Sequence, residues 1–168
     1  GIASVTNMKV DNFEKHIEDT MIAGDYISDR QAVEQVVRNA PAQIAELVKW
    51  GVNFDKQSNG DFDLHREGGH SEFRILHHAD DTGAEIQRGL MEAVKNTPNI
   101  DVKENHFAVE IITQHHLGIE VTRRTPDIEC YGAYVLNPET QKVDTYLSKV
   151  TLMCTGGCGA VYQSTTNP

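Results

Sequence analysis

The chain has 168 residues, of which 39% are hydrophobic and 24% charged, which is typical of one ordinary globular domain. Its formal net charge of −10 argues against nucleic acid as a partner, because phosphate binding needs a basic patch. No apolar run approaches the ~18 residues that a membrane span needs, so no membrane partner is expected. Three cysteines, Cys130, Cys154 and Cys158, make a poor disulfide framework, which favours a reducing, cytoplasmic location.

The first half of the chain carries helical patterns. Ser28 or Asp29 can cap a helix. Its apolar stripe is Ala32, Val33, Val36 and Val37. Pro41 suits the first turn of a second helix, which Gly51 would end. The inward residues of this second helix are Ile44, Leu47 and Val48.

A further helix is predicted after residue 81. Thr82 and Glu85 have the spacing of a capping box, in which the two side chains satisfy free amide donors at a helix start. The buried stripe of this helix is Ile86, Leu90 and Val94. Asn96 and Pro98 would stop it.

The second half changes to strand patterns. Residues 100–104 and 107–113 are rich in β-branched and aromatic residues and predict strands, followed by a polar loop over 115–129. Residues 131–136 and 143–147 flank an Asn-Pro-Glu-Thr turn and predict a hairpin. A last strand, 150–154, would run into Thr155-Gly156-Gly157. The fold class is therefore α/β, with a helical first half, a small β-meander and a strand–Gly-Gly turn.

The densest chemistry lies in REGGHSEFRILHHADDTG, residues 66–83. Glu67 stands on a glycine-flanked turn and could recognise a cationic group such as an amine. The alternative is a surface carboxylate paired with Arg66 or Arg74, a common and weak arrangement. Four histidines, at 65, 70, 77 and 78, lack zinc-site spacing, and adjacent His77 and His78 cannot face the same way, so no metal site is expected.

Thr155-Gly156-Gly157 could let backbone amides approach a ligand, although most such turns are only turns. No G-x-G-x-x-G occurs in the chain, so the main phosphate loop of a dinucleotide site is not expected within it. Cys154 and Cys158 have no second Cys/His pair at a suitable spacing, which disfavours zinc.

Taken together, the order of the segments resembles the L-aspartate oxidase branch of the succinate dehydrogenase/fumarate reductase flavoprotein family. The matching stretches are GIASV (1–5), HIEDTMIAGDYISDRQAV (16–33), LVKWGVNFD (47–55), REGGHSEFRILHHADDTG (66–83), FAVEII (107–112) and TGGCGAVYQSTTNP (155–168). The likeness runs end to end, and the REGGHS and TGG…VYQ.TTNP motifs are specific to this group. The resemblance implies a partial FAD/NAD(P)-binding-type domain in which residues 1–168 form a single domain, an internal segment of a longer protein.

The same resemblance implies FAD as cofactor and oxidation of L-aspartate to iminoaspartate, by hydride transfer from Cα to the flavin, in NAD (quinolinate) biosynthesis. Oxygen or fumarate would reoxidise the flavin, and quinolinate synthase is a candidate pathway partner. The glycine fingerprint and the capping and catalytic parts of the family would lie outside this segment. On its own the segment is expected to be inactive and to hold FAD weakly.

The resemblance also implies roles for individual residues. Glu67 would meet the substrate ammonium. The residues expected to support this loop are His70, Ser71 and Arg74. The residues expected at the cofactor are Gly1, Ile2 and Ala3 by the isoalloxazine ring, Ala108 and Val109 by the adenine through their backbone, and Thr155, Gly156 and Gly157 in a neighbouring turn.

Two alternatives stay open. One is a segment of a fumarate reductase or succinate dehydrogenase flavoprotein, and Glu67 discriminates this from the aspartate enzyme. The other is a His/carboxylate metal-binding module over residues 65–78. The departures from the family pattern, the 115–129 insertion and CTGGC, fall outside the expected site.

Overall fold

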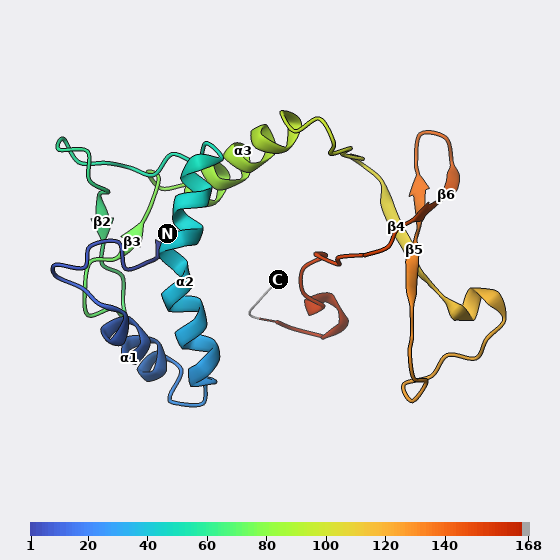
Figure 1. The fold of residues 1–168 in the computed structure, drawn as a ribbon, viewed down its shortest axis with the longest axis horizontal. Helices are drawn as coiled ribbons and strands as arrows, with labels where there is room; N and C mark the ends of the chain where they lie inside the picture. The colour runs from blue at the N-terminus through green and yellow to red at the C-terminus, as the bar shows by residue number, and fades with distance from the viewer. Residues whose placement is uncertain (166–168) are drawn as a thin grey trace. The chain divides into compact units, whose positions relative to one another are not determined.

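A computed structural model describes residues 1–165, which divide after Asp101 into two compact units, 1–101 and 102–165. The single domain over residues 1–168 that the sequence led us to expect stays a prediction, and each unit is described by itself. Figure 1 draws the elements of each unit. In the described residues no helix combines the length and the apolar character that crossing a membrane would need.

The first unit combines helices with a small antiparallel sheet. The helices are α1 (Phe13–Ala23), α2 (Arg30–Lys49) and α3 (Thr82–Lys95). The strands are β1 (Ile2–Ala3), β2 (Leu64–His65) and β3 (Ile75–Leu76), in the order β1-β3-β2. The main core consists of Ile44, Val52, Phe54 and Leu76, with Ile2, Leu47, Phe62, Leu64 and Ile86 packed around them. Buried apolar area of this kind supplies most of the folding free energy.

Helix α1 was not among the predicted elements. Asn12 caps it by accepting a hydrogen bond from the backbone N–H of Lys15 at 2.9 Å. Its apolar residues recur every fourth position and pack against α2, beside which it lies in Figure 1. This second cluster is Ile17, Met21 and Val37, with Phe13 and Val33. The Asn12 cap and the spacing of these residues were the signals that could have revealed the helix.

Helix α2 corrects the prediction of two separate helices. Asp29 caps it as expected, accepting from the N–H groups of Gln31 and Ala32, but the helix continues through Pro41 to Lys49. A proline inside a helix removes one backbone hydrogen bond, and packing of Val37 and Ile44 on either side of it offsets that loss. Gly51 follows the helix end with φ +93°, as expected for a terminating glycine. Val36 and Val48 were wrongly placed inside, since both are exposed.

Helix α3 begins and ends where expected, but the predicted capping box is wrong. The hydroxyl of Thr82 instead accepts a hydrogen bond from the N–H of His78 at 3.2 Å. Glu85 accepts from the N–H of Asn53 at 2.7 Å and from Arg88. Thr82 and Glu85 therefore bond to residues outside the helix start instead of to each other's backbone. Asn96 caps the end of the helix as predicted.

The second unit is an antiparallel meander of β4 (Phe107–Thr113), β5 (Cys130–Asn137) and β6 (Lys142–Leu147). Short 3-10 turns occupy Gln114–Leu117 and Gly159–Val161. The strand over 107–113 and the 131–147 hairpin are confirmed, with Asn137 opposite Lys142. The loop 115–129 is tied at its base, because the Gln114 side chain bonds the backbone of Asp127 and Glu129.

Two predicted strands are wrong. Residues 100–104 and 150–154 have no strand pairing in the part of the chain that the structure describes. Val150 and Leu152 are more than 80% exposed. A β-rich composition forms a strand only where a neighbouring strand accepts its backbone hydrogen bonds, and neither segment has one here.

Candidate functional site

The loop that carries Glu67 connects β2 to β3 in the first unit. Its tight turn is closed by a hydrogen bond from the His70 N–H to the Glu67 carbonyl at 3.2 Å, with Gly69 at φ +82°. Such a φ suits glycine and strains other residues. The loop therefore has a defined conformation at the position where the sequence indicated a functional corner.

Arg74 anchors the base of this loop from inside the unit. Its guanidinium is fully buried and donates two hydrogen bonds of 2.8 Å to the two carboxylate oxygens of Asp11. It also donates to Asp19 through a very short contact. A fork of donors matched to a carboxylate is the arrangement in which arginine is strongest.

Asp19 connects buried Arg74 to the loop. The same oxygen that accepts from Arg74 also accepts from the backbone N–H and the hydroxyl of Ser71, each at 2.8 Å. The ring Nδ1 of His70 lies 3.2 Å from Arg74 Nη1. The structure thus brings together His70, Ser71 and Arg74, the three residues predicted to support the loop. Asp11 and Asp19, which hold them, were not found from the sequence.

The charges of this network are stabilised by one another. Burial disfavours the charged forms of Asp11 and Asp19, but hydrogen bonds from Arg74 and from backbone amides outweigh it, so the pKa of each carboxyl lies below its ordinary value. The pKa of Arg74 is raised by the same two carboxylates, against the effect of its burial. Buried neighbouring His16 responds in the opposite way. Its desolvation and the positive charge of Arg74 lower its pKa to about 4, which keeps it neutral.

Glu67 itself is exposed and lies beside the N-terminal strip. Its Oε1 is 3.2 Å from where a Cβ on Gly1 would stand. Neither proposed cationic partner pairs with it: Arg66 lies over the ring of Phe73, and Arg74 is held by its aspartates. Within residues 1–165, no ion pair to the Glu67 carboxylate is formed, so the carboxylate is available to an external cation.

Gly1 illustrates how closely the segments approach at this corner. A Cβ there would stand 2.1 Å from the Cγ2 of buried Ile75 and 3.1 Å from the carbonyl oxygen of Leu76. Only glycine allows β1 to approach β3 this closely. The strip predicted to lie by the flavin, Gly1 to Ala3, is therefore held on the same sheet that positions the loop.

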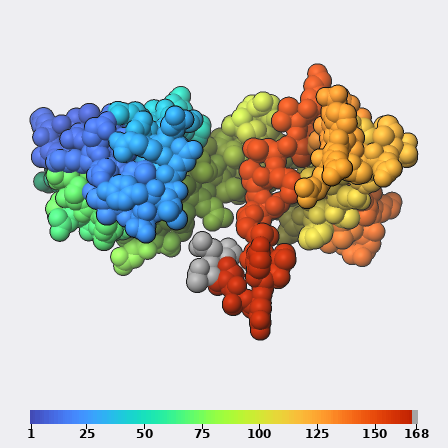
Figure 2. Space-filling view, turned by 90° about the horizontal axis from the view of Figure 1, so that it is seen from below, coloured from blue at the N-terminus to red at the C-terminus, as the bar shows by residue number. Residues whose placement is uncertain are grey.

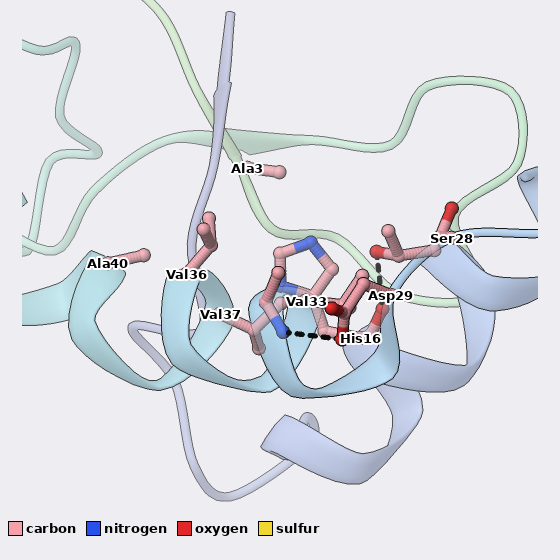
Figure 3. A pocket seen from close by; sticks show the side chains of 10 residues that line it. Ala3, His16, Ser28, Asp29, Val33, Val36, Val37 and Ala40 are labelled. Atoms are coloured by element: carbon pink, nitrogen blue, oxygen red, sulfur yellow. Dashed lines mark hydrogen bonds between the residues drawn. The ribbon is translucent and has the colours of Figure 1, made fainter. Parts of the chain in front are cut away.

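An open pocket of about 470 Å³ borders Ala3. Figure 3 shows His16 between Ala3 and the valines of α2. The Nδ1 of His16 is buried, and no residue among 1–165 makes a hydrogen bond with it. The walls are otherwise mostly apolar. His16, which shares the buried side of α1 with Ile17, was not among the residues predicted to be functional.

In the second unit, the predicted adenine contacts lie on β4. The register of β4 with β5 shifts between Ala108 and Glu110, which leaves Val109 as an extra residue outside the ladder. Its backbone groups can therefore serve a ligand. Thr155, Gly156 and Gly157 lie in an exposed, irregular segment, with Gly156 at φ +76° and open space around both glycines. The two units are described separately, so these residues are not placed against Glu67.

A close glycine contact, a bulged strand and an accessible glycine turn are features that a cofactor-binding domain can use. The chain belongs to the FAD binding domain family, whose model matches residues 1–168. It is 44% identical to "L-aspartate oxidase 2-b, chloroplastic" of Nicotiana tabacum over 168 residues, which is all of this chain and 25% of that protein. It is also 44% identical to an L-aspartate oxidase of Yersinia pestis, covering 31% of it.

Among solved structures, an E. coli quinol fumarate reductase matches all of this chain with a TM-score of 0.82 and 26% identity, over 26% of that chain. The chain thus spans between a quarter and a third of the relatives named here. The partial FAD-binding fold inferred from the sequence is confirmed by these likenesses. FAD fits the residues present, since the extra residue of the bulge, Val109, offers unladdered backbone groups and Gly1 removes a side chain at the predicted flavin edge.

Proposed function

We propose that this chain is part of an FAD-dependent enzyme that oxidises L-aspartate to iminoaspartate. The observation that carries the proposal is the carboxylate of Glu67, which makes no ion pair with any residue among 1–165 and lies beside Gly1 in a chain 44% identical to L-aspartate oxidases. Fumarate or oxygen is the acceptor expected for the reduced flavin. The chain spans at most 31% of those relatives, so the remaining catalytic groups belong to the rest of the polypeptide.

Glu67 is the residue that recognises the substrate. Its carboxylate accepts hydrogen bonds from the α-ammonium of aspartate, a charge-assisted contact that succinate and fumarate cannot make. FAD, when bound, supplies the acceptor for the hydride from Cα. Gly1 lets its strand lie close to Ile75 and Glu67, because any side chain at this position would collide with them.

The Arg74 network holds Glu67 in position. Ser71 is tied to Asp19 by two hydrogen bonds, and Asp19 is tied to buried Arg74. The loop end that follows Glu67 is thereby fixed to α1. A recognition carboxylate held in this way loses less conformational freedom when it binds a ligand.

The test is Glu67→Gln in the full-length enzyme. The KM for L-aspartate is expected to rise about 10- to 100-fold, the range for a hydrogen bond to a charged group. Inhibition by succinate, which has no ammonium, is expected to change little. Steady-state kinetics with succinate as a competitive inhibitor measure both quantities. Glu72→Gln is the matched control, because Glu72 lies in the same loop but pairs with Lys15.

The second candidate is a fumarate reductase or succinate dehydrogenase flavoprotein, favoured by the structural likeness to quinol fumarate reductase. Under this alternative Glu67 has no ammonium to bind. Equal losses for aspartate and succinate in Glu67→Gln would favour it, as would succinate oxidation that exceeds aspartate oxidation in the unmodified enzyme.

The enzyme would serve NAD biosynthesis, where iminoaspartate goes to quinolinate. Quinolinate synthase as a partner and a cytoplasmic location stay predictions, and the similar protein of tobacco is described as chloroplastic. The three cysteines are all free and exposed.

A further inference from the structure

A group of histidine and aspartate side chains lies on the first unit's sheet, apart from the Arg74 network. In the register of β2 with β3, Leu64 is opposite Leu76 and His65 is opposite Ile75. Extending this register by one residue places Asp63 opposite His77. Because side chains alternate along a strand, Asp63, His65 and His77 share one face. The sequence showed no zinc-site spacing and left a His/carboxylate module over residues 65–78 only as an alternative, because His77 lies 12 and 14 positions from His65 and Asp63 and meets them through the strand register.

His77 is the buried member of this group. Its side chain is 10% exposed, and within residues 1–165 neither ring nitrogen makes a hydrogen bond. Buried polar atoms without partners are uncommon, because each costs the free energy of its lost hydration. Its Nε2 lies 3.6 Å from Asp63 Oδ2. One ligand atom from each of Asp63, His65 and His77 lies within 4.8 Å of the others.

Asp55 is placed to orient the ring of His77 from the other side. Its Oδ2 lies 3.3 Å from His77 Nδ1, and the same oxygen accepts a hydrogen bond of 2.7 Å from the N–H of Ala79. A carboxylate at Nδ1 favours the tautomer whose Nε2 carries a lone pair. Outer carboxylates orient histidine ligands of metals by accepting a hydrogen bond from this N–H, and Asp55 is the carboxylate near enough to His77 to do so when an ion binds.

The ligand atoms are near the separation that a small ion requires. With bonds of about 2.0–2.1 Å, tetrahedral ligands lie roughly 3.3 Å apart. The rings of His65 and His77 are stacked with centroids 3.7 Å apart. Coordination by both requires the exposed ring of His65 to turn out of the stack, while the buried His77 ring stays in place.

A second histidine group provides a useful contrast. Glu110, His115 and His116 also come together, but their ring nitrogens already have partners. The N–H of Thr113 donates to His116 Nδ1, so a neutral His116 carries its proton on Nε2, the atom that faces Glu110. His115 likewise contacts the Thr113 hydroxyl and Glu110. These hydrogen bonds account for the group without an ion.

We propose that Asp63, His65 and His77 form a binding site for a divalent first-row transition metal such as Zn²⁺ or Co²⁺, with Asp55 orienting His77. Two imidazole nitrogens and one carboxylate oxygen suit these ions, and three protein ligands leave positions open for water. The site is additional to the flavin chemistry and does not depend on it.

The test is a titration of the tag-free full-length protein with Co²⁺, in which calorimetry and visible absorption each measure binding. One Co²⁺ per chain is expected to bind with visible ligand-field bands, and Zn²⁺ is expected to displace it. Asp63→Asn and His65→Asn should each weaken binding at least about 100-fold, because the first replaces an anionic ligand by a neutral amide and the second removes an imidazole. Asp55→Asn should weaken it by about 10- to 100-fold, the range for an orienting partner.

His115→Asn is the matched control and should bind Co²⁺ as the unmodified protein does. Asp63 and His65 are accessible enough for their substitutions to leave the fold intact, which thermal melting without metal verifies. The proposal is overturned if the unmodified protein takes up no stoichiometric Co²⁺. It is equally overturned if Asp63→Asn and His65→Asn bind normally, or if His115→Asn abolishes binding.

Discussion

Arg74 is the residue on which the loop most depends. Because it is fully buried between two carboxylates, Arg74→Met should leave Asp11 and Asp19 with uncompensated buried charge. We expect a loss of about 3–5 kcal/mol in the free energy of unfolding, as for other broken buried pairs. Urea unfolding measures this. Arg66→Met, which removes an exposed cation lying over Phe73, should change the stability by less than about 1 kcal/mol. Similar losses in the two variants would contradict the buried anchor.

His16 should make the fold sensitive to acid. Its pKa of about 4 in the folded state lies below its ordinary 6.5, so the unfolded chain binds the proton more readily. The stability due to neutral His16 is therefore fully present above pH 6.5 and is lost as the pH falls towards 4. In His16→Phe, the urea midpoint should fall less steeply between pH 6.5 and 4 than in the unmodified protein. Parallel pH profiles would show that His16 is not the group responsible.

The sequence identified residues with functional chemistry more readily than it identified the residues that contact them. The glycine-flanked turn around Glu67 could be predicted because the glycines and the carboxylate are adjacent in the chain. The partners of Arg74 could not be predicted, because Asp11 and Asp19 lie 63 and 55 positions away in the sequence. They meet Arg74 only through the packing of α1 and the residues before it. Glu67 does not pair with Arg66 or Arg74, because one guanidinium lies over Phe73 and the other is held by the two aspartates.

Among the elements, α3 is secured to the turn after α2 through Glu85. Hydrogen bonds from Arg88 and the Asn53 N–H, which outweigh desolvation, lower the pKa of Glu85 to about 2. A lowered carboxyl pKa gives stability that is present above the ordinary value of 4.5 and is lost as the pH falls towards 2. Glu85→Gln should therefore be less stable than the unmodified protein at pH 7, and the difference should shrink between pH 4.5 and 2. Glu92→Gln, which removes an exposed partner of the same Arg88, is the control. A difference independent of pH would contradict this account.

Local patterns predicted elements where local forces decide them. The 107–113 strand, the hairpin turn and the Asp29 cap follow from alternation and turn chemistry within a few residues. Pro41 misled because tertiary packing of α2 outweighed a local rule. Residues 150–154 misled in the opposite sense, since strand propensity cannot act without a neighbouring strand.

At the scale of the whole molecule, each unit exposes large apolar side chains. Val36 is 70% exposed on α2 in the first unit, and Leu152 is 84% exposed in the second. The side chains of α2 lie on the face of the first unit visible in Figure 2 (light blue).

Large apolar side chains that gather on a surface mark a contact with other protein or a tendency to associate. We expect the 168-residue chain, produced alone, to bind the dye ANS and to self-associate in size-exclusion chromatography. The same residues within a polypeptide of the length of the L-aspartate oxidase relatives should do neither, because the rest of the chain would cover Val36 and Leu152. In the 168-residue chain, the double substitution Val36→Thr and Leu152→Ser should reduce both dye binding and self-association. A short chain that elutes as a monomer without dye fluorescence would contradict the expectation, and would mean that its exposed apolar residues are too dispersed to act as one surface.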